Sequence, residues 1–306
     1  MTTTERVILP TGYWVKGVHQ RLARLRPLNG EDQACLDMRD AEIGVASWDW
    51  ATTLLARCVE RLGAIEPVST SLLGELTVGD REALLLHLRR MTLGDRMQAT
   101  MRCPAAACGA PMDLDLRVTD LLLPPYHDVA PEHEFVEQMA AGPVRVRFRL
   151  PTVADQEAAT ETVLKSVRTY GGSDAQVVTE SGINNAVKML LRRCVRDIRQ
   201  NGERIAELPT ELIPSLTQRM SELDPQAELS LRAVCPACGG SFTSELDTAR
   251  FLLDEIRGRT ARLFREVHAL AFHYHWSEQE ILRLPLARRL LYLALLDEEL
   301  RYRSGE

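Results

Sequence analysis

Two pairs of cysteines are the residues in this sequence best suited to chemistry. Cys103 and Cys108 lie in the stretch CPAAACG, and Cys235 and Cys238 lie in CPACGG. In each pair a proline follows the first cysteine and a glycine follows the second. A structural zinc ion takes four thiolate or imidazole ligands, and one turn that presents two sulfurs supplies half of them. We therefore predict a structural Zn²⁺ bound by Cys103, Cys108, Cys235 and Cys238.

Alternating sequences flank both pairs and predict a β-hairpin under each one. QATMRC leads into the first pair and PMDLDLRV leads out, whereas AELSLRAVC leads into the second and SFTSELD leads out. Closing the long loop between the pairs costs a term that grows only with the logarithm of its length. Structural zinc contributes on the order of 10 kcal/mol. We expect the ion to hold the two hairpin tips together in a zinc-ribbon-like site.

Two other interpretations of these four cysteines are weaker, namely four ordinary reduced thiols and a set of disulfides. The remaining cysteines, Cys35, Cys58 and Cys194, lie singly in apolar helical patterns, which predicts small core residues. The total of seven is odd, and the N-terminal MTTTERVILP is typical of neither a secretory signal nor a membrane anchor. These features predict a protein that folds in a reducing cytoplasm.

The sequence contains none of the common catalytic motifs. P-loop, GxGxxG, GxSxG and HExxH patterns are absent. His268, His273 and His275 are the best candidates for enzyme chemistry, but their spacing does not place two imidazoles at i and i+4 on one helix face. Four thiolates also leave zinc no open position for water, so the ion is expected to support structure. We predict that the protein is not an enzyme.

Composition and charge are those of a globular protein. The 306 residues are 45% hydrophobic and 26% charged, with 5% aromatic residues and a net charge of −6. This acidic balance argues against a nucleic-acid partner, although Arg257, Arg259, Arg262 and Arg265 keep a nucleic-acid-binding zinc-ribbon protein as the alternative. The longest apolar run, LLYLALL at 290–296, is far shorter than the ~20 residues of a membrane span.

Hydrophobic periodicity divides the chain into three predicted parts. An N-terminal hairpin and helices occupy 1–66, a zinc-clamped α+β domain with a helical lobe between the cysteine pairs occupies 67–246, and a helical segment occupies 247–306. Within them, 7–28 predicts two strands, 48–64 predicts one helix, and SGINNAVKMLLRRCVRDIRQNG predicts another that Asn201 and Gly202 end. The stretch LTVGDREALLLHLRRMTLGD predicts a further helix, which Thr77 or Asp80 is expected to cap.

The last part is expected to be helical throughout. An apolar stripe from Thr248 to His275 predicts one long helix, and Ser277 with Glu280 forms a capping-box signature. The final helix, with LLYLALL, is apolar on more sides than one packing contact covers, so it is buried between elements or meets another protein. The expected fold class is α+β, mainly helical, with β-hairpins forming a zinc-ribbon-like four-cysteine site and a C-terminal helical hairpin.

Four separated stretches, taken together and in order, resemble a known family. They are LPTGYWVKGVHQRLARLRPLNGEDQ, LTVGDREALLLHLRRMTLGD, the paired CPAAACG and CPACGG with RFRLPTVADQE between them, and FREVHALAFHYHWSEQEILRLPLARRLLYL. This set is similar to the baseplate and hub-assembly protein family of T-even-like contractile phage tails, including relatives encoded with contractile injection systems. The likeness runs over nearly the whole chain.

The resemblance implies a non-enzymatic baseplate component or assembly factor that acts through protein-protein contacts. Its partners would be other tail proteins, such as baseplate, hub, spike or tape-measure components, and it would be assembled in the cytoplasm. The resemblance leaves open whether the protein stays in the finished particle, and the sequence leaves open its oligomeric state. The region around Trp276 and the run 290–296 are the expected docking surface, with completion of the core as the competing interpretation.

Overall fold

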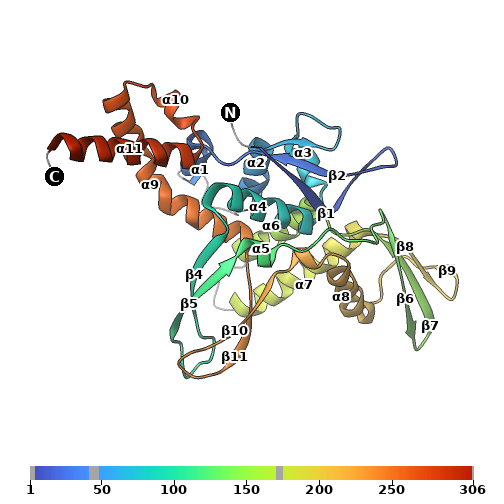
Figure 1. Ribbon diagram of the computed structural model, residues 1–306. Coiled ribbons are helices and arrows are strands. Elements are labelled where there is room, and N and C mark those ends of the chain that lie inside the picture. Colours follow the sequence, from blue (N-terminus) through green and yellow to red (C-terminus); the bar gives the residue numbers. More distant parts are fainter. Residues whose placement is uncertain (1–3, 41–47, 170–174, 305–306) are drawn as a thin grey trace.

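The computed structural model describes residues 4–40, 48–169 and 175–304. Its strands form four antiparallel sheets with the orders β1-β2-β3, β4-β5, β6-β7-β8-β9 and β10-β11 (Figure 1). The strand bounds are β1 Glu5–Val15, β2 Val18–Leu25, β3 Val59–Leu62, β4 Arg96–Arg102, β5 Pro111–Arg117, β6 His133–Met139, β7 Gly142–Phe148, β8 Val195–Gln200, β9 Glu203–Arg204, β10 Ser230–Val234 and β11 Ser241–Glu245.

Helices connect and cover these sheets. Their bounds are α1 Gly30–Asp40, α2 Trp48–Cys58, α3 Thr70–Gly74, α4 Val78–Leu93, α5 Val118–Leu121, α6 Val153–Thr169, α7 Ala175–Cys194, α8 Ile213–Leu223, α9 Thr248–Tyr274, α10 Glu278–Leu282 and α11 Leu286–Ser304, with short 3₁₀ turns η1 Thr210–Leu212 and η2 Pro225–Ala227. Among the described residues, no helix is both long enough and apolar enough to span a membrane.

Several local predictions are confirmed. The segment 7–28 forms the hairpin β1-β2, and Thr77 caps α4 by accepting a hydrogen bond from the N–H of Asp80. The long helix begins at Thr248 as expected, and Ser277 with Glu280 makes the capping box of α10. The division of the chain at 66/67 and 246/247 stays a prediction.

The prediction of a mainly helical chain is wrong, because strands replace helix at two junctions and the fold is a mixed α+β fold with four sheets. The helix predicted over 48–64 ends at Cys58, and the helix predicted to reach Asn201 ends at Cys194. In both places the chain continues directly as a strand, β3 or β8. Pairing with an existing hairpin satisfies the backbone there and outweighs the helical periodicity of the side chains.

These two junctions belong to two units of the same topology. The first unit is β1-β2-α1-α2-β3 and the second is β6-β7-α6-α7-β8, and in each unit the last strand joins the sheet beside the second strand. Short sequences recur at the same places: RPLNGEDQ and RLPTVADQ follow the hairpins, and LLARCV and LLRRCV end the second helices. Each unit is followed by helices and then by one of the cysteine hairpins.

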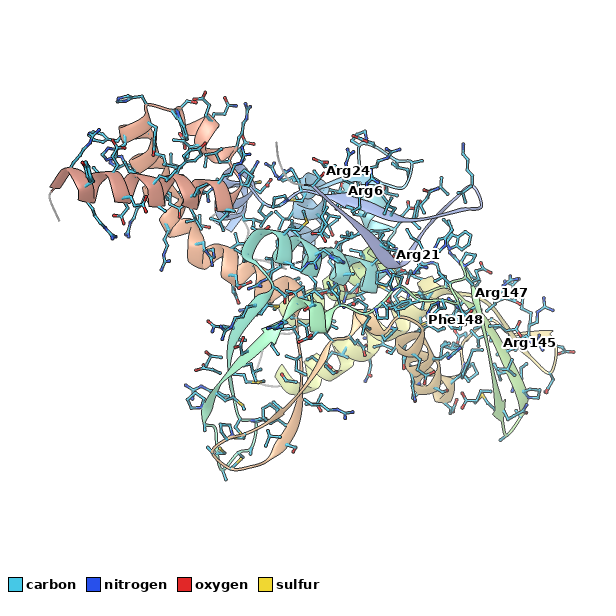
Figure 2. All side chains as sticks on the ribbon, in the orientation of Figure 1. Arg6, Arg21, Arg24, Arg145, Arg147 and Phe148 are labelled. Atoms are coloured by element: carbon cyan, nitrogen blue, oxygen red, sulfur yellow. The ribbon has the colours of Figure 1, made fainter. Side chains whose placement is uncertain are left out.

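Hydrogen bonding and strand register repeat in the same detail. The pairing of β2 with β3 shifts between Arg24 and Leu25, and that of β7 with β8 shifts between Arg147 and Phe148; Figure 2 labels Arg24 and Arg147. The N–H of Arg26 donates to the carbonyl oxygen of Cys58 (3.0 Å). The N–H of Arg149 donates in the same way to Cys194 (3.1 Å). The two units therefore share a backbone plan and not only an element order.

Four separate hydrophobic clusters lie in the interior formed by the described residues. One lies in the first unit and includes residues of α4 and α9, and a second lies within the second unit and α8. A small third cluster lies at the base of the cysteine hairpins, and the fourth joins α9, α10 and α11. The sheet of the second unit, β6 to β9, lies at one side of the molecule, whereas its helices α6 and α7 lie near the middle (Figure 1).

Candidate functional site

The cysteines lie at the tips of two hairpins, β4-β5 and β10-β11, as the alternating sequences predict. The strands pair along their whole length, with Arg102 opposite Pro111 and Val234 opposite Ser241 at the last pairs before the turns. The two hairpins lie beside each other in Figure 1. The turns of these two hairpins, which are distant in sequence, therefore lie close together in space.

Equivalent backbone hydrogen bonds close both turns. The N–H of Cys103 donates to the carbonyl oxygen of Ala110, and that of Cys235 donates to Gly240, each over 2.9 Å. Gly109 and Gly239 have φ values of 57° and 71°. This left-handed conformation suits glycine, because a Cβ atom is disfavoured there. The first turn contains more residues between its cysteines than the second, yet both end in the same closure.

The four sulfurs converge on one point. The Sγ atoms of Cys103 and Cys238 lie 3.8 Å apart, as do those of Cys108 and Cys235. All four Sγ atoms lie within 4.8 Å of one another. In the described part of the chain this is the one group of three or more histidine, cysteine or acidic side chains with the spacing of metal ligands.

This donor set has the geometry of a tetrahedral thiolate site. A tetrahedron with metal–sulfur bonds of 2.3 Å, the length found for zinc, has sulfur–sulfur edges of about 3.8 Å. A disulfide requires about 2.05 Å, so the sulfurs are not placed for a bond to each other. Hydrogen bonds from the N–H groups of Cys238 and Ala237 lower the pKa of Cys235 to about 7. Backbone hydrogen bonds also act to lower the pKa values of Cys103 and Cys108, but burial and the neighbouring sulfurs outweigh them, so both pKa values are raised. The distances between the four sulfurs, and not their pKa values, are therefore what fits a metal site.

A small hydrophobic cluster holds the bases of the two hairpins together. Met97 of β4 and Val118 of α5 are buried there with Leu86 of α4, and Leu231 and Leu246 of the second hairpin pack against them. The first hairpin is thus connected to α4 directly, and the second through side chains that alternate along its strands. Because this packing aligns the two hairpins, their tips lie side by side and the four sulfurs meet there.

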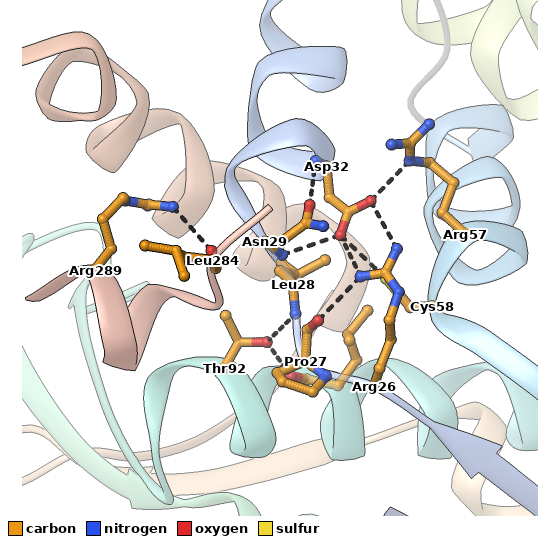
Figure 3. Close-up of polar contacts among 11 residues, drawn as sticks. Arg26, Pro27, Leu28, Asn29, Asp32, Arg57, Cys58, Thr92, Leu284 and Arg289 are labelled. Atoms are coloured by element: carbon orange, nitrogen blue, oxygen red, sulfur yellow. Dashed lines mark hydrogen bonds and ion pairs between the residues drawn. The ribbon is translucent and has the colours of Figure 1, made fainter. Parts of the chain in front are cut away.

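Each unit also contains a buried aspartate that binds two arginines, a feature that the sequence interpretation missed. Asp32 accepts hydrogen bonds from Arg26 (2.6 Å) and Arg57 (2.8 Å) and from the N–H of Asn29 (3.0 Å), as Figure 3 shows. Burial opposes ionisation of Asp32, but the hydrogen bonds from Arg26 and Arg57 outweigh it and lower the pKa of Asp32. The carboxylate ties the beginning of α1 to the end of α2.

The second unit repeats this cluster around Asp155. Its carboxylate binds Arg149 and, over 2.6 Å, Arg193, and accepts from the N–H of Thr152 (3.0 Å). Cys194 lies 3.9 Å from Asp155, as Cys58 lies 3.9 Å from Asp32. The signal in the sequence is an arginine six residues before Asp-Gln, repeated at 26–33 and 149–156.

Of the three cysteines predicted to be core residues, Cys58 and Cys194 are buried, whereas Cys35 is only half-buried. Burial raises the pKa of Cys194 to about 12 and shifts the pKa of Cys58 in the same direction, so both thiols stay protonated and unreactive, as core residues do. His268 stacks on Phe272, and His273 meets the same ring edge-on. No metal-ligand group within the described residues contains these histidines.

Helix α11 has one face that no other described element covers. Leu286, Arg289 and Leu296 face inward and are buried, whereas Leu290, Leu291 and Leu295 are 43%, 57% and 47% exposed. Residues 287 and 294 are exposed alanines on the same face, so the apolar stripe 287, 290, 291, 294 and 295 follows i, i+3, i+4, i+7 and i+8 spacing. Figure 1 shows α11 at one end of the molecule.

The region around Trp276 is the other part of the expected docking surface, and unlike the exposed face of α11 its aromatic rings pack against one another. The Trp276 ring stacks on Tyr274 (centroids 5.0 Å apart) and meets Tyr292 edge-on (4.8 Å). These three rings join α9 to α11 and belong to the hydrophobic cluster of the C-terminal helices. The exposed apolar surface of this region therefore consists of the α11 stripe and Phe272, which is 67% exposed, and does not include the tryptophan.

Comparison with known proteins gives one family. Residues 24–252 match the family model described as T4 bacteriophage base plate protein. The match begins near the end of β2, so it covers α1, α2 and β3 of the first unit, the whole of the second unit and both cysteine hairpins. No curated protein and no solved structure gives a significant match.

Proposed function

The chain belongs to the T4 bacteriophage base plate protein family, and we propose that it is a non-enzymatic structural or assembly protein of a contractile phage tail or a related injection system. The observation that carries this proposal is the family match over residues 24–252, about three quarters of the chain. A protein with this role works through surfaces that meet other baseplate, hub, spike or tape-measure proteins, during assembly in the cytoplasm or in the finished particle.

We place one such contact on the α11 stripe. Leucines and alanines at three-four spacing form a ridge that fits the apolar stripe of a second helix, and two helices packed this way bury their leucines between them. The occupant we infer is a helix of another tail protein with a matching stripe. Exposed leucines in contact with water favour such a contact, at roughly 25 cal/mol for each Å² of apolar surface buried.

We also propose that Cys103, Cys108, Cys235 and Cys238 hold a structural Zn²⁺. Four thiolates complete the coordination of the ion, so it would supply a cross-link and no catalytic water. The residues joined in this way lie at the tips of the hairpins that follow the two units. The role we assign to the ion is to fix the second unit relative to the first. The nucleic-acid-binding alternative gains no support from the family match.

Purification of the tagged protein from cells that carry its neighbouring tail genes tests the proposed role. We expect a tail protein to co-purify with the unaltered chain and to be lost with Leu291→Glu combined with Leu295→Glu. The matched control is Glu299→Ala with Arg303→Ala, which removes an exposed ion pair of the same helix and leaves the stripe intact. Recovery of the same tail proteins with both double variants contradicts the α11 contact, and recovery of none from any of the three contradicts the proposed role.

A further inference from the structure

The second unit has an open groove of 480 Å³ where the end of α7 meets β8 and the chain that follows β9. Its floor is formed by six buried or half-buried apolar side chains, Leu191, Val195, Ile198, Ile205, Leu208 and Ile213. Exposed charged side chains form the rim, namely Lys188, Arg192, Arg196, Arg204 and Glu207, with half-buried Asp197 beside Arg204. A groove of this composition offers both burial of apolar surface and charge recognition.

The rim is positive and its charge is mostly uncompensated. Arg204 binds Asp197 over 3.2 Å, and Asp197 also binds Arg199. Within the ranges that the structure describes, Lys188, Arg192 and Arg196 make no ion pair. These three cations stand in a chain with a net charge of −6. An acidic ligand is therefore attracted to this place, although the chain as a whole carries a net negative charge.

The first unit indicates what kind of element covers this face. The repeated LLxRCV sequence aligns Lys188, Arg192 and Arg196 with Thr52, Ala56 and Glu60, none of which is basic. Thr52 is only 6% exposed, and its hydroxyl donates to Glu157 of helix α6 over 2.9 Å. In the first unit, a helix thus brings a carboxylate to the position that Lys188 holds in the second.

We propose that the groove binds an acidic amphipathic helix of a partner protein. Leucine-type side chains on one face of that helix would fill the apolar floor, and carboxylates along its edges would pair with Lys188, Arg192 and Arg196. The lack of basic residues at 52, 56 and 60 means that the common plan of the two units does not require a cationic rim. The rim is therefore a property of the second unit alone, and at the place of Lys188 the first unit has Thr52 bound to Glu157 of α6.

The proposal rests on the proposed function only in that the partner is taken to be a tail protein. The test uses the purified full chain and a defined peptide probe. The probe is a fluorescein-labelled helical peptide of about 18 residues, with leucines at i, i+3, i+4 and i+7 and glutamates on both flanks. A second peptide has lysine in place of every glutamate. Fluorescence anisotropy at about 0.1 M and about 0.5 M salt gives the dissociation constants.

We expect the acidic peptide to bind at least ~10-fold more tightly than the lysine peptide, with weaker binding at the higher salt. Arg192→Glu combined with Arg196→Glu should weaken it by at least ~10-fold. The control is Arg145→Glu on strand β7 (Figure 2), which is not among the residues that line the groove and should leave the binding unchanged. If the double variant does not fold by circular dichroism, the exposed single change Lys188→Glu provides the same comparison.

Equal binding of the two peptides, or equal binding by the unaltered chain and the rim variants, overturns the proposal. So does tighter binding of single-stranded DNA than of the acidic peptide with the same dependence on Arg192 and Arg196, since the groove is then a nucleic-acid surface. These outcomes leave the family role untouched. Binding of a peptide to the exposed leucines of α11 is distinguished from binding in the groove because it does not depend on Arg192 and Arg196.

Discussion

The Sγ atom of Cys103 lies 3.8 Å from that of Cys238, although 135 positions of the chain separate the two residues. Cys103 belongs to the hairpin that follows the first unit, and Cys238 belongs to the hairpin that follows the second. A metal bound here joins the two units through one short bridge. Its removal should therefore affect how the units are held together more than the interior of either unit.

Substitution of one exposed ligand tests the bound metal directly. Cys238→Ser changes a single exposed side chain, so without metal it should alter the free energy of unfolding by less than about 0.5 kcal/mol. With structural zinc present we expect the free energy of unfolding to fall by about 3 kcal/mol or more. A site that lacks one ligand binds the ion more weakly, so the ion then stabilises the fold less. Chemical denaturation measures this, and native mass spectrometry counts the ion.

Cys35→Ser is the matched control for that experiment. Cys35 is half-buried in α1 and is not part of the four-sulfur group. It should retain the full metal content. A chain purified under reducing conditions that holds no metal, or an unchanged stability in Cys238→Ser, would contradict the zinc proposal.

The paired aspartates predict matched losses of stability in the two units. Asp32→Asn or Asp155→Asn removes a charge that two arginines bind in each cluster. We expect each change to lower the free energy of unfolding by about 2–3 kcal/mol, less than a fully buried pair because the arginines are partly exposed. Asp254→Asn, which breaks an exposed pair with Arg250, should cost under about 0.5 kcal/mol. A negligible effect of one aspartate beside a large effect of the other would contradict the equivalence of the units.

The elements that the sequence predicted well are those whose signals are local. Alternation and turn residues predicted the hairpin β1-β2 and the two cysteine hairpins, and a cap with an apolar stripe predicted α4 and α9. The hairpin β6-β7 was not predicted. The helix-to-strand junctions after Cys58 and Cys194 were missed because Leu55, Cys58 and Leu62, like Leu191, Cys194 and Ile198, keep helical spacing across the junction. Only pairing with β2 and β7, which are distant in sequence, decides that these segments are strands.

The candidate site was predictable to a similar extent. Cysteine spacing predicted which four side chains meet, since few other arrangements satisfy two such turns. The clusters around Asp32 and Asp155 gave no comparable signal, because an arginine and an aspartate six positions apart are common on any surface. Their burial depends on α2 and α7 returning to the hairpins. The groove at Arg192 and Arg196 also forms only when the second unit folds.

A buried carboxylate at the beginning of α4 predicts a pH dependence. Burial raises the pKa of Asp80 to about 7, although the N–H groups of Thr11 and Gly12 donate to it over 2.8 Å. The folded pKa lies above the unfolded value of about 3.9, so the folded state holds the proton more tightly. Its stabilising effect is complete below about pH 4 and is lost as the pH rises through about 7.

We therefore expect the free energy of unfolding of the unaltered protein to fall by about 2–4 kcal/mol relative to that of Asp80→Asn as the pH rises from about 4.5 to about 7.5. The comparison is made at each pH by chemical denaturation, and the readout is the difference in slope and not the absolute stability of the variant. The pKa of His87 is lowered to about 4 by burial and acts in the opposite direction, but it is present in both proteins and cancels. Parallel pH profiles would show that Asp80 is ionised throughout this range.

Two glycines in helices predict opposite effects of the same substitution. The N–H of Gly79 donates to Asp224 over 2.9 Å, and a Cβ atom at Gly79 would lie 1.9 Å from the Oδ1 atom of Asp224, which is itself buried. Gly79→Ala must therefore displace Asp224 and its hydrogen bond from Tyr126, and we expect the free energy of unfolding to fall by about 2–3 kcal/mol.

Gly258 lies in α9 with nothing within 4 Å of its Cβ position. Gly258→Ala should stabilise the protein by about 0.5–1 kcal/mol, because alanine favours the helix. Thermal and chemical unfolding of the two variants side by side measures both signs, and a stabilising or neutral Gly79→Ala would show that the close approach of α4 to Asp224 relaxes without cost.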